Sequence, residues 1–157
     1  MLKILFVCYG NICRSPMAEF LAKELFEKRN IKAEIESKAT SDEEVGAPVY
    51  YMTARILDRR KIDYSHKRAE KMCRTDGDRF DYIIGMEQSN VRAIKKIIDP
   101  SNHYKVSRLL DFTDSPGDID DPWYTRDFDK TLQDVTKGLE GFLRYLQAND
   151  PQAGGAR

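Results

Sequence analysis

The sequence predicts a three-layer α/β fold, in which helices flank both faces of a four-stranded parallel sheet with strand order 2-1-3-4. Apolar runs of strand length alternate with segments of helical periodicity along the 157-residue chain, as in sheets built from right-handed crossovers. The runs at 4–7 and 82–86 are apolar throughout, which is typical of central strands. The segment 31–35 alternates apolar and charged residues, which indicates an edge strand.

The first half of the chain provides two of these strands and two helices. Residues 4–7 form the first strand, and Ser15 can cap a helix with Pro16 in its first turn. This helix should run to about Arg29 and lead into the second strand at 33–37. A loop rich in turn residues is expected at 40–48, followed by a helix from about Tyr50 to Arg60.

The second half repeats the alternation and ends in a long helix. The polar segment 66–79 predicts a short helix and a turn at Asp76-Gly77, before the strand at 82–86. The remaining expected elements are a helix at 91–98 stopped by Pro100, a short strand at 104–107, an acidic loop at 111–121 and a helix at 126–148 with apolar residues three and four apart. We expect one domain, residues 1–150, and a disordered tail, residues 151–157.

Composition excludes several classes of function. Lys and Arg together number 26, as do Asp and Glu, so no overall basic field predicts nucleic-acid binding. No apolar run is long enough to span a membrane, and no signal peptide is recognisable. The three Cys are unevenly spaced, and Cys and His lack the spacing of metal ligands, so we expect reduced thiols, no metal, no cofactor and a cytoplasmic protein.

The candidate site is the stretch 8–16, Cys-Tyr-Gly-Asn-Ile-Cys-Arg-Ser-Pro, which joins the first strand to the first helix. A helix start presents unpaired N–H groups and partial positive charge to an anion. With Arg14 it should lower the pKa of Cys8 and favour the nucleophilic thiolate. The Arg14 fork can hold two phosphoryl oxygens, and Gly10 and Asn11 tolerate the positive φ of an anion-binding nest.

This stretch resembles the phosphate-binding loop of the low-molecular-weight protein tyrosine phosphatases. The resemblance implies hydrolysis of phosphotyrosine through a cysteinyl-phosphate formed on Cys8, with Arg14 as a second catalytic residue. The implied phosphate-binding residues are Tyr9, Gly10, Asn11, Ile12, Cys13 and Arg14.

The resemblance extends beyond the loop. Asp121, immediately before Pro122, matches the family's general acid, whereas Asp118 and Asp120 do not. Asn11, Ser15, Ser37 and His66 match positions that support the loop by hydrogen bonds. Cys13 matches the loop Cys that can form a disulfide with Cys8 under oxidation, although a buried packing Cys is an equally good interpretation.

The pocket rim departs from many relatives. Glu43 and Glu44 stand where an aromatic wall residue is common, and Trp123 replaces the first Tyr after Asp-Pro. The expected substrate pocket consists of Tyr9, Ile12, Glu43, Trp123 and Tyr124. It should accept an aryl phosphate and disfavour acidic peptides.

Three other functions remain open. Arginine phosphatases share this scaffold but resemble a form with Thr in place of Ile12. Arsenate reductases need further Cys, and only Cys73 lies outside the loop. A phosphotyrosine-binding module would not need Cys8, Arg14 and Asp121 together. The expected partners are tyrosine-phosphorylated proteins, with a cognate tyrosine kinase as a further candidate, and we expect a monomer, with a weak dimer as the alternative.

Overall fold

The computed structural model describes residues 1–154 and contains one parallel sheet in the order β2-β1-β3-β4. This arrangement confirms the predicted fold class and strand order. The strands are β1 (Leu2–Cys8), β2 (Ala33–Ala39), β3 (Tyr82–Gly85) and β4 (Val106–Arg108). β1 lies between β2 and β3, so the crossovers on its two sides leave in opposite directions and open a crevice beyond its carboxyl end.

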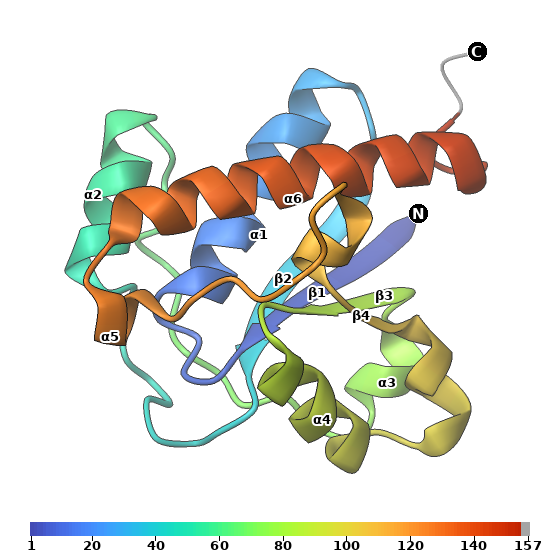
Figure 1. The fold of residues 1–157 in the computed structure, drawn as a ribbon, viewed down its shortest axis with the longest axis horizontal. Helices are drawn as coiled ribbons and strands as arrows, with labels where there is room; N and C mark the ends of the chain where they lie inside the picture. The colour runs from blue at the N-terminus through green and yellow to red at the C-terminus, as the bar shows by residue number, and fades with distance from the viewer. Residues whose placement is uncertain (155–157) are drawn as a thin grey trace.

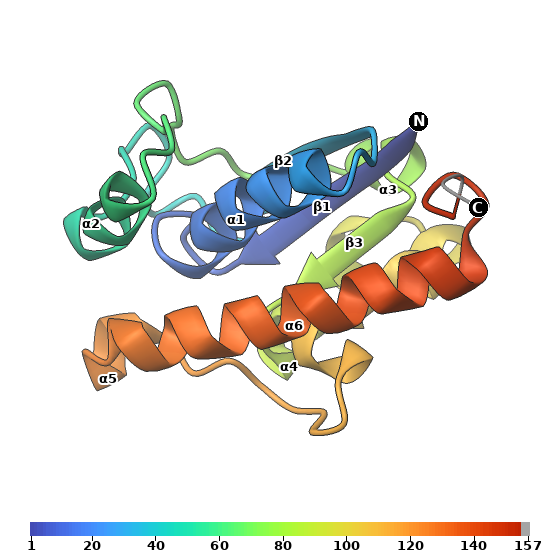
Figure 2. The same cartoon turned by 90° about the horizontal axis from the view of Figure 1, so that it is seen from above.

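Helices cover both faces of the sheet (Figure 1). α1 (Arg14–Lys28) and α6 (Phe128–Asn149) pack on one face, and α3 (Asp76–Arg79) and α4 (Gln88–Ile97) pack on the other. α2 (Tyr51–Arg59) and α5 (Pro122–Thr125) lie at the end toward which β1 points, as Figure 2 shows from above. Two 3-10 helices, η1 (Pro100–Lys105) and η2 (Leu109–Phe112), flank β4. Within residues 1–154, no helix is both long and apolar enough to cross a membrane.

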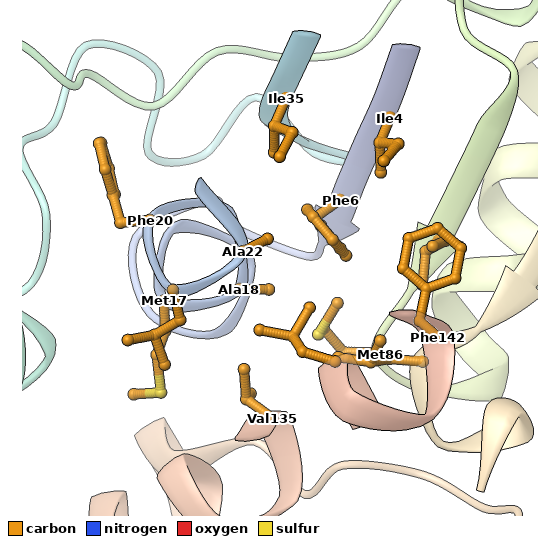
Figure 3. Packing of buried hydrophobic residues seen from close by; sticks show 14 of the residues in the cluster. Ile4, Phe6, Met17, Ala18, Phe20, Ala22, Ile35, Met86, Val135 and Phe142 are labelled. Carbon is orange, nitrogen blue, oxygen red and sulfur yellow. The ribbon is translucent and has the colours of Figure 1, made fainter. Parts of the chain in front are cut away.

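Alternation along β1 divides the core into two layers. Ile4 and Phe6 face α1 and α6, whereas Leu5 and Val7 face the layer that contains α4, and all four are fully buried. Figure 3 shows Ile4 and Phe6 directed toward side chains of α1 and α6, among them Phe142. A strand that is buried on both faces must be apolar at every position, which is why its sequence lacks the alternation of an edge strand.

Several predicted boundaries are corrected by local hydrogen bonds. α1 begins at Arg14 with Cys13 at its N-cap position, so Ser15 is not the cap. α4 begins three residues earlier than predicted, because the Asn90 side chain accepts the backbone N–H of Glu87 at 3.0 Å. β4 starts at Val106 instead of residue 104, because η1 occupies the preceding residues.

Two other predictions fail in segments of low apolar content. The predicted turn at Asp76-Gly77 is the start of α3, where Asp76 is buried against Lys38 of β2 at 3.0 Å. The predicted disordered tail is wrong at its start. Gln152 donates its backbone N–H to Asp150 at 3.0 Å, and Ala153 is buried in the core. Residues 155–157 of that tail lie outside the described residues.

The close approach of α6 to η2 yields a stability prediction. A Cβ at Gly141 would overlap the backbone carbonyl of Phe112, which cannot move as a flexible side chain can. Despite the better helix propensity of Ala, we expect Gly141→Ala to lower the free energy of unfolding by about 2 kcal/mol or more, measured by urea denaturation. Gly117→Ala, a control in open space, should change it by less than about 0.5 kcal/mol. Equal stabilities would contradict the tight contact.

Candidate active site

The thiol of Cys8 lies at the carboxyl end of the central strand β1, where the chain turns into α1. The Cys8 side chain is buried. Backbone bonds hold the start of the turn, since Thr40 donates to the Cys8 carbonyl at 3.0 Å and Ser41 donates to the Tyr9 carbonyl at 3.1 Å. The position predicted from the apolar run and the helix start is therefore the one observed.

Two polar groups contact the Cys8 sulfur. The backbone N–H of Asn11 donates to Sγ at 3.3 Å, and Ser15 Oγ lies 3.0 Å from the same atom. Asn11 has a φ of 59°, in the left-handed region, and this conformation turns its N–H toward the sulfur. Gly10, which was expected to share this role, does not have positive φ. Asn tolerates the left-handed conformation better than most residues, which explains its presence here.

A chain of buried hydrogen bonds runs from α1 through β2 to the sulfur. The Glu19 carboxylate only accepts, so Ser37 Oγ donates to it at 2.6 Å. Asn11 Nδ2 then donates both of its protons, to Ser37 Oγ at 2.9 Å and to Ser15 Oγ at 2.8 Å. The Ser15 hydroxyl accepts from Asn11 and lies 3.0 Å from Cys8 Sγ, so its own proton can be donated to a thiolate there. The carboxylate fixes the direction of the bond from Ser37, and the Asn11 amide fixes the next two.

The prediction that His66 supports the loop is wrong. Its side chain is exposed, and its ring packs edge-on against Phe20 with the ring centroids 5.9 Å apart. Lys67 lies closer to the network: its Nζ donates to the Ser37 carbonyl at 2.7 Å and lies 3.5 Å from the Glu19 carboxylate. Among the described residues, Glu19 and Lys67 supply what the sequence assigned to His66. The other three predicted supports, Asn11, Ser15 and Ser37, are in contact.

Arg14 is buried and held from two sides. Its Nη1 donates to the Glu87 carboxylate and, at 2.9 Å, to the carbonyl of Ile119. Its Nη2 lies 3.4 Å from Asp121 Oδ2. Burial alone would lower the pKa of this guanidinium. The negative charges facing it, on Cys8, Asp121 and Glu87, outweigh burial and raise the pKa. A charge buried to this extent requires such partners.

Asp121 stands opposite the loop, at the N-cap of α5. Its Oδ1 accepts the backbone N–H of Trp123 at 3.0 Å, which leaves Oδ2 facing Arg14. Asp118, which the sequence analysis set aside, instead accepts from the Gln88 backbone and from Arg108. Asp120 is exposed. The Asp-Pro motif therefore selects the one carboxylate of the three that lines the pocket.

A small pocket of about 90 Å³ lies over Cys8. Five of the six residues predicted to bind phosphate line it, and the sixth, Asn11, lies behind them. The predicted pocket residues all line it. On the rim, the Tyr9 hydroxyl donates to Glu43 at 2.6 Å, and this bond raises the pKa of Tyr9. The lining residues are Cys8, Tyr9, Gly10, Ile12, Cys13, Arg14, Glu43, Glu44, Asp121, Trp123 and Tyr124.

Cys13 shares the pocket wall but has a different environment. Burial raises the pKa of its thiol to about 12, and the neighbouring charge of Cys8 adds to the rise. Cys13 is therefore a neutral thiol at physiological pH. The third cysteine, Cys73, is exposed, and its Sγ lies 3.1 Å from Thr75 Oγ1.

Comparison with known proteins assigns this chain to a family. The sequence model of the low molecular weight phosphotyrosine protein phosphatases matches residues 3–152. A match over this length shows that the chain belongs to that family.

Relatives of known structure agree with this assignment. The chain is 34% identical to the low molecular weight protein-tyrosine-phosphatase YfkJ of Bacillus subtilis, covering 94% of this chain and 97% of that protein. The crystal structure of YfkJ superimposes with a TM-score of 0.91 over 96% of this chain and 97% of that one. SP-PTP from Streptococcus pyogenes is 41% identical, with a TM-score of 0.82 over 96% of both chains. The chain is 26% identical to a Drosophila arginine phosphatase, whose crystal structure superimposes with a TM-score of 0.86 over 95% of this chain and 100% of that protein's chain.

Three charged residues of the site were missed from the sequence: Glu19, Lys67 and Glu87. Glu87 follows β3, the neighbour of β1, so a carboxylate just beyond a central strand was the available signal. Glu19 lies inside α1 and resembles an ordinary helix-surface residue, but it is buried beside Ser37 of β2 and Lys67. No local pattern distinguishes such a residue from an exposed one.

The environment of Cys13 predicts a pH effect on stability. The pKa of Cys13 is about 12 in the folded protein against 9.0 for a free thiol. Its neutral form therefore adds to the free energy of unfolding in full below pH 9, and this stabilisation is lost as pH rises toward 12, because only the unfolded chain ionises in that range. At pH 10 this loss should reach about 1.4 kcal/mol. Urea unfolding at pH 8 and pH 10 under reducing conditions should show that Cys13→Ala loses correspondingly less stability than the wild type. Parallel losses would contradict the assigned pKa.

Proposed function

We propose that the protein is a protein tyrosine phosphatase that hydrolyses phosphotyrosine through a cysteinyl-phosphate. The observation that carries the proposal is the contact of Cys8 Sγ with the Asn11 N–H and Ser15 Oγ, in a pocket lined also by Arg14 and Asp121. An acceptor sulfur that receives two donors suits a thiolate, which is the attacking form.

In the first step the thiolate of Cys8 attacks phosphorus, and the bond from phosphorus to the phenolic oxygen breaks. Arg14 and the loop N–H groups of residues 9–14 hold the phosphoryl oxygens, where negative charge is spread in the transition state. Asp121, in its protonated form, gives its proton to the leaving phenolate oxygen. Its position on the pocket wall, 3.4 Å from Arg14, supports this role.

In the second step water attacks the phosphorus, and the bond from phosphorus to sulfur breaks. Asp121, now a carboxylate, takes a proton from the water, which restores its starting state. The Ser15 hydroxyl donates to the departing sulfur, so the hydrogen bonds that stabilise the thiolate also make it a better leaving group. Inorganic phosphate is the product.

The substrate class is inferred from the pocket wall. Ile12 offers no hydroxyl to a guanidinium-borne phosphate, and Trp123 and Tyr124 supply aromatic surface for a tyrosine ring. Phosphoarginine remains the alternative substrate, because an arginine phosphatase shares the fold. Arsenate reduction is disfavoured, since Cys73 is outside the set of pocket residues. A binding module would have no use for Asp121.

Further elements of the proposal concern the context of the enzyme. The substrates would be tyrosine-phosphorylated proteins in the cytoplasm, with a cognate tyrosine kinase as a further partner, and the enzyme would act as a monomer. Cys8 and Cys13, which both line the pocket, are the candidate redox pair. Oxidation would join the two sulfurs in a disulfide with loss of two electrons to an oxidant such as peroxide, and a thiol reductant would restore the nucleophile.

One comparison tests the proposal. Phosphate release should be measured side by side from peptides that carry phosphotyrosine, phosphoserine or phosphoarginine. We expect phosphotyrosine to be hydrolysed fastest, Cys8→Ser to be inactive and the matched control Cys73→Ser to retain full activity. Faster phosphate release from phosphoarginine would make phosphoarginine the substrate in place of phosphotyrosine. Turnover by Cys8→Ser would exclude Cys8 as the nucleophile.

The role of Asp121 is tested by leaving-group dependence. Asp121→Asn keeps the side-chain shape and its bond to the Trp123 N–H but has no proton to give. We expect kcat for phenyl phosphate to fall about 100-fold or more, with a smaller loss for nitrophenyl phosphate, whose leaving oxygen needs less protonation. Equal losses for both substrates would argue against a general acid.

A further inference from the structure

We propose that Tyr50 and Arg126 form a latch that positions the Asp121 turn over the phosphate-binding loop. This inference rests on the proposed function, because the group it positions is the proposed general acid. Both are positioning residues: neither is among the residues that line the pocket over Cys8.

Tyr50 is attached to the phosphate-binding loop through its backbone. Its N–H donates to the Ile12 carbonyl at 2.9 Å, and the Thr53 hydroxyl, one helical turn further along α2, donates to the Cys13 carbonyl at 3.3 Å. The start of α2 is thereby fixed to the loop that carries the nucleophile. The Tyr50 ring extends from this anchor toward the α5 turn and meets Trp123 edge-on, with ring centroids 5.0 Å apart.

Arg126 provides the contact from the other side. It ends α5 in the left-handed conformation, with a φ of 61°, and its N–H donates to the Pro122 carbonyl at 2.9 Å. Its Nη2 donates to the Tyr50 hydroxyl at 2.8 Å, and its guanidinium lies 5.5 Å from the centre of the Tyr50 ring. The same cation lies within 5.9 Å of the Trp123 ring.

The conformation of Arg126 needs compensation. An Arg in the left-handed region is disfavoured, and no backbone requirement excludes Gly or Asn, which adopt it readily. What Arg adds is reach, because only a long cationic side chain can return from the end of α5 to the Tyr50 hydroxyl and three aromatic rings. The contacts of the Arg126 side chain offset the cost of its left-handed backbone, and this backbone conformation directs the side chain toward Tyr50.

The consequence concerns Asp121, the N-cap of this four-residue helix. The turn from Asp121 to Arg126 is held at its start by the Asp121–Arg14 contact at 3.4 Å. At its end it is held by the latch and by α6, which begins two residues later at the buried Phe128. Removing the latch would loosen the turn between these two anchors, and the carboxylate would spend less time aligned with the leaving oxygen. Proton donation should suffer more than attack by Cys8, which is anchored separately on β1.

The test uses two variants that remove only the latch. Arg126→Asn tolerates positive φ but lacks the reach, and Tyr50→Phe keeps the ring but loses the hydroxyl. Arg144→Gln, an exposed charge on α6, controls for loss of one cation. We expect both latch variants to lower kcat for phenyl phosphate about three- to tenfold and to leave kcat for nitrophenyl phosphate nearly normal. The inhibition constant of inorganic phosphate should be unchanged. The double variant should be no worse than Arg126→Asn alone, because Arg126→Asn already removes the hydrogen bond that Tyr50→Phe removes.

A second readout does not depend on activity. Trp123 is the single tryptophan of the chain, so intrinsic tryptophan fluorescence reports on this turn alone. We expect acrylamide to quench Trp123 more strongly in Arg126→Asn and Tyr50→Phe than in Arg144→Gln, with unchanged urea midpoints. A wild type that fails to hydrolyse any aryl phosphate would refute the proposed function while this measurement still tested the latch.

The outcomes separate clearly. Leaving-group-dependent loss with increased quenching supports the latch. Equal loss with both substrates, additive effects in the double variant, or quenching equal to that of the Arg144→Gln control would each overturn it.

Discussion

The hydrogen-bonded line from Glu19 to the sulfur of Cys8 is the constraint on which the site depends. It is assembled from three parts of the fold, since Glu19 lies on α1, Ser37 on β2 and Asn11 in the loop after β1. The β1–β2 register pairs Phe6 with Ser37, which sets the hydroxyl beside the loop. Within residues 1–154, every buried side-chain nitrogen or oxygen has a partner. Loss of any member would therefore leave a buried polar group unpaired, at a cost of about 1–3 kcal/mol.

A second constraint is the balance of charge around Arg14. A buried guanidinium without partners would be strongly destabilising. Arg14 is compensated by the Glu87 carboxylate, the Ile119 carbonyl and the Asp121 carboxylate. They also fix the orientation of the fork before any ligand enters, so little reorganisation is needed when an anion binds. The contacts that stabilise the buried guanidinium are therefore also the ones that orient it for the proposed anion binding.

The sequence predicted the parts of the protein that are encoded locally. The uninterrupted apolar runs identified the central strands, the alternation in 31–35 identified the edge strand, and these patterns determined the strand order. The loop stretch and the Asp-Pro pair located the pocket, because each is a contiguous motif. Glu19, Glu87 and the Tyr50–Arg126 contact were not predictable in this way, since each depends on packing between elements far apart in sequence. The prediction for His66 was wrong for the opposite reason. Its position matches the family, but its side chain packs on Phe20 and does not hydrogen-bond the loop.

The proposed nucleophile, Cys8, and the proposed proton donor, Asp121, are anchored differently. Cys8 ends a strand that is buried on both faces, whereas Asp121 caps a four-residue helix in which only Pro122 is buried. Substitutions in the first region disturb the whole molecule, and substitutions in the second disturb one short turn. Under the proposed mechanism, a substitution in this short turn would change how the leaving group is protonated while the thiol and its hydrogen-bond partners keep their positions.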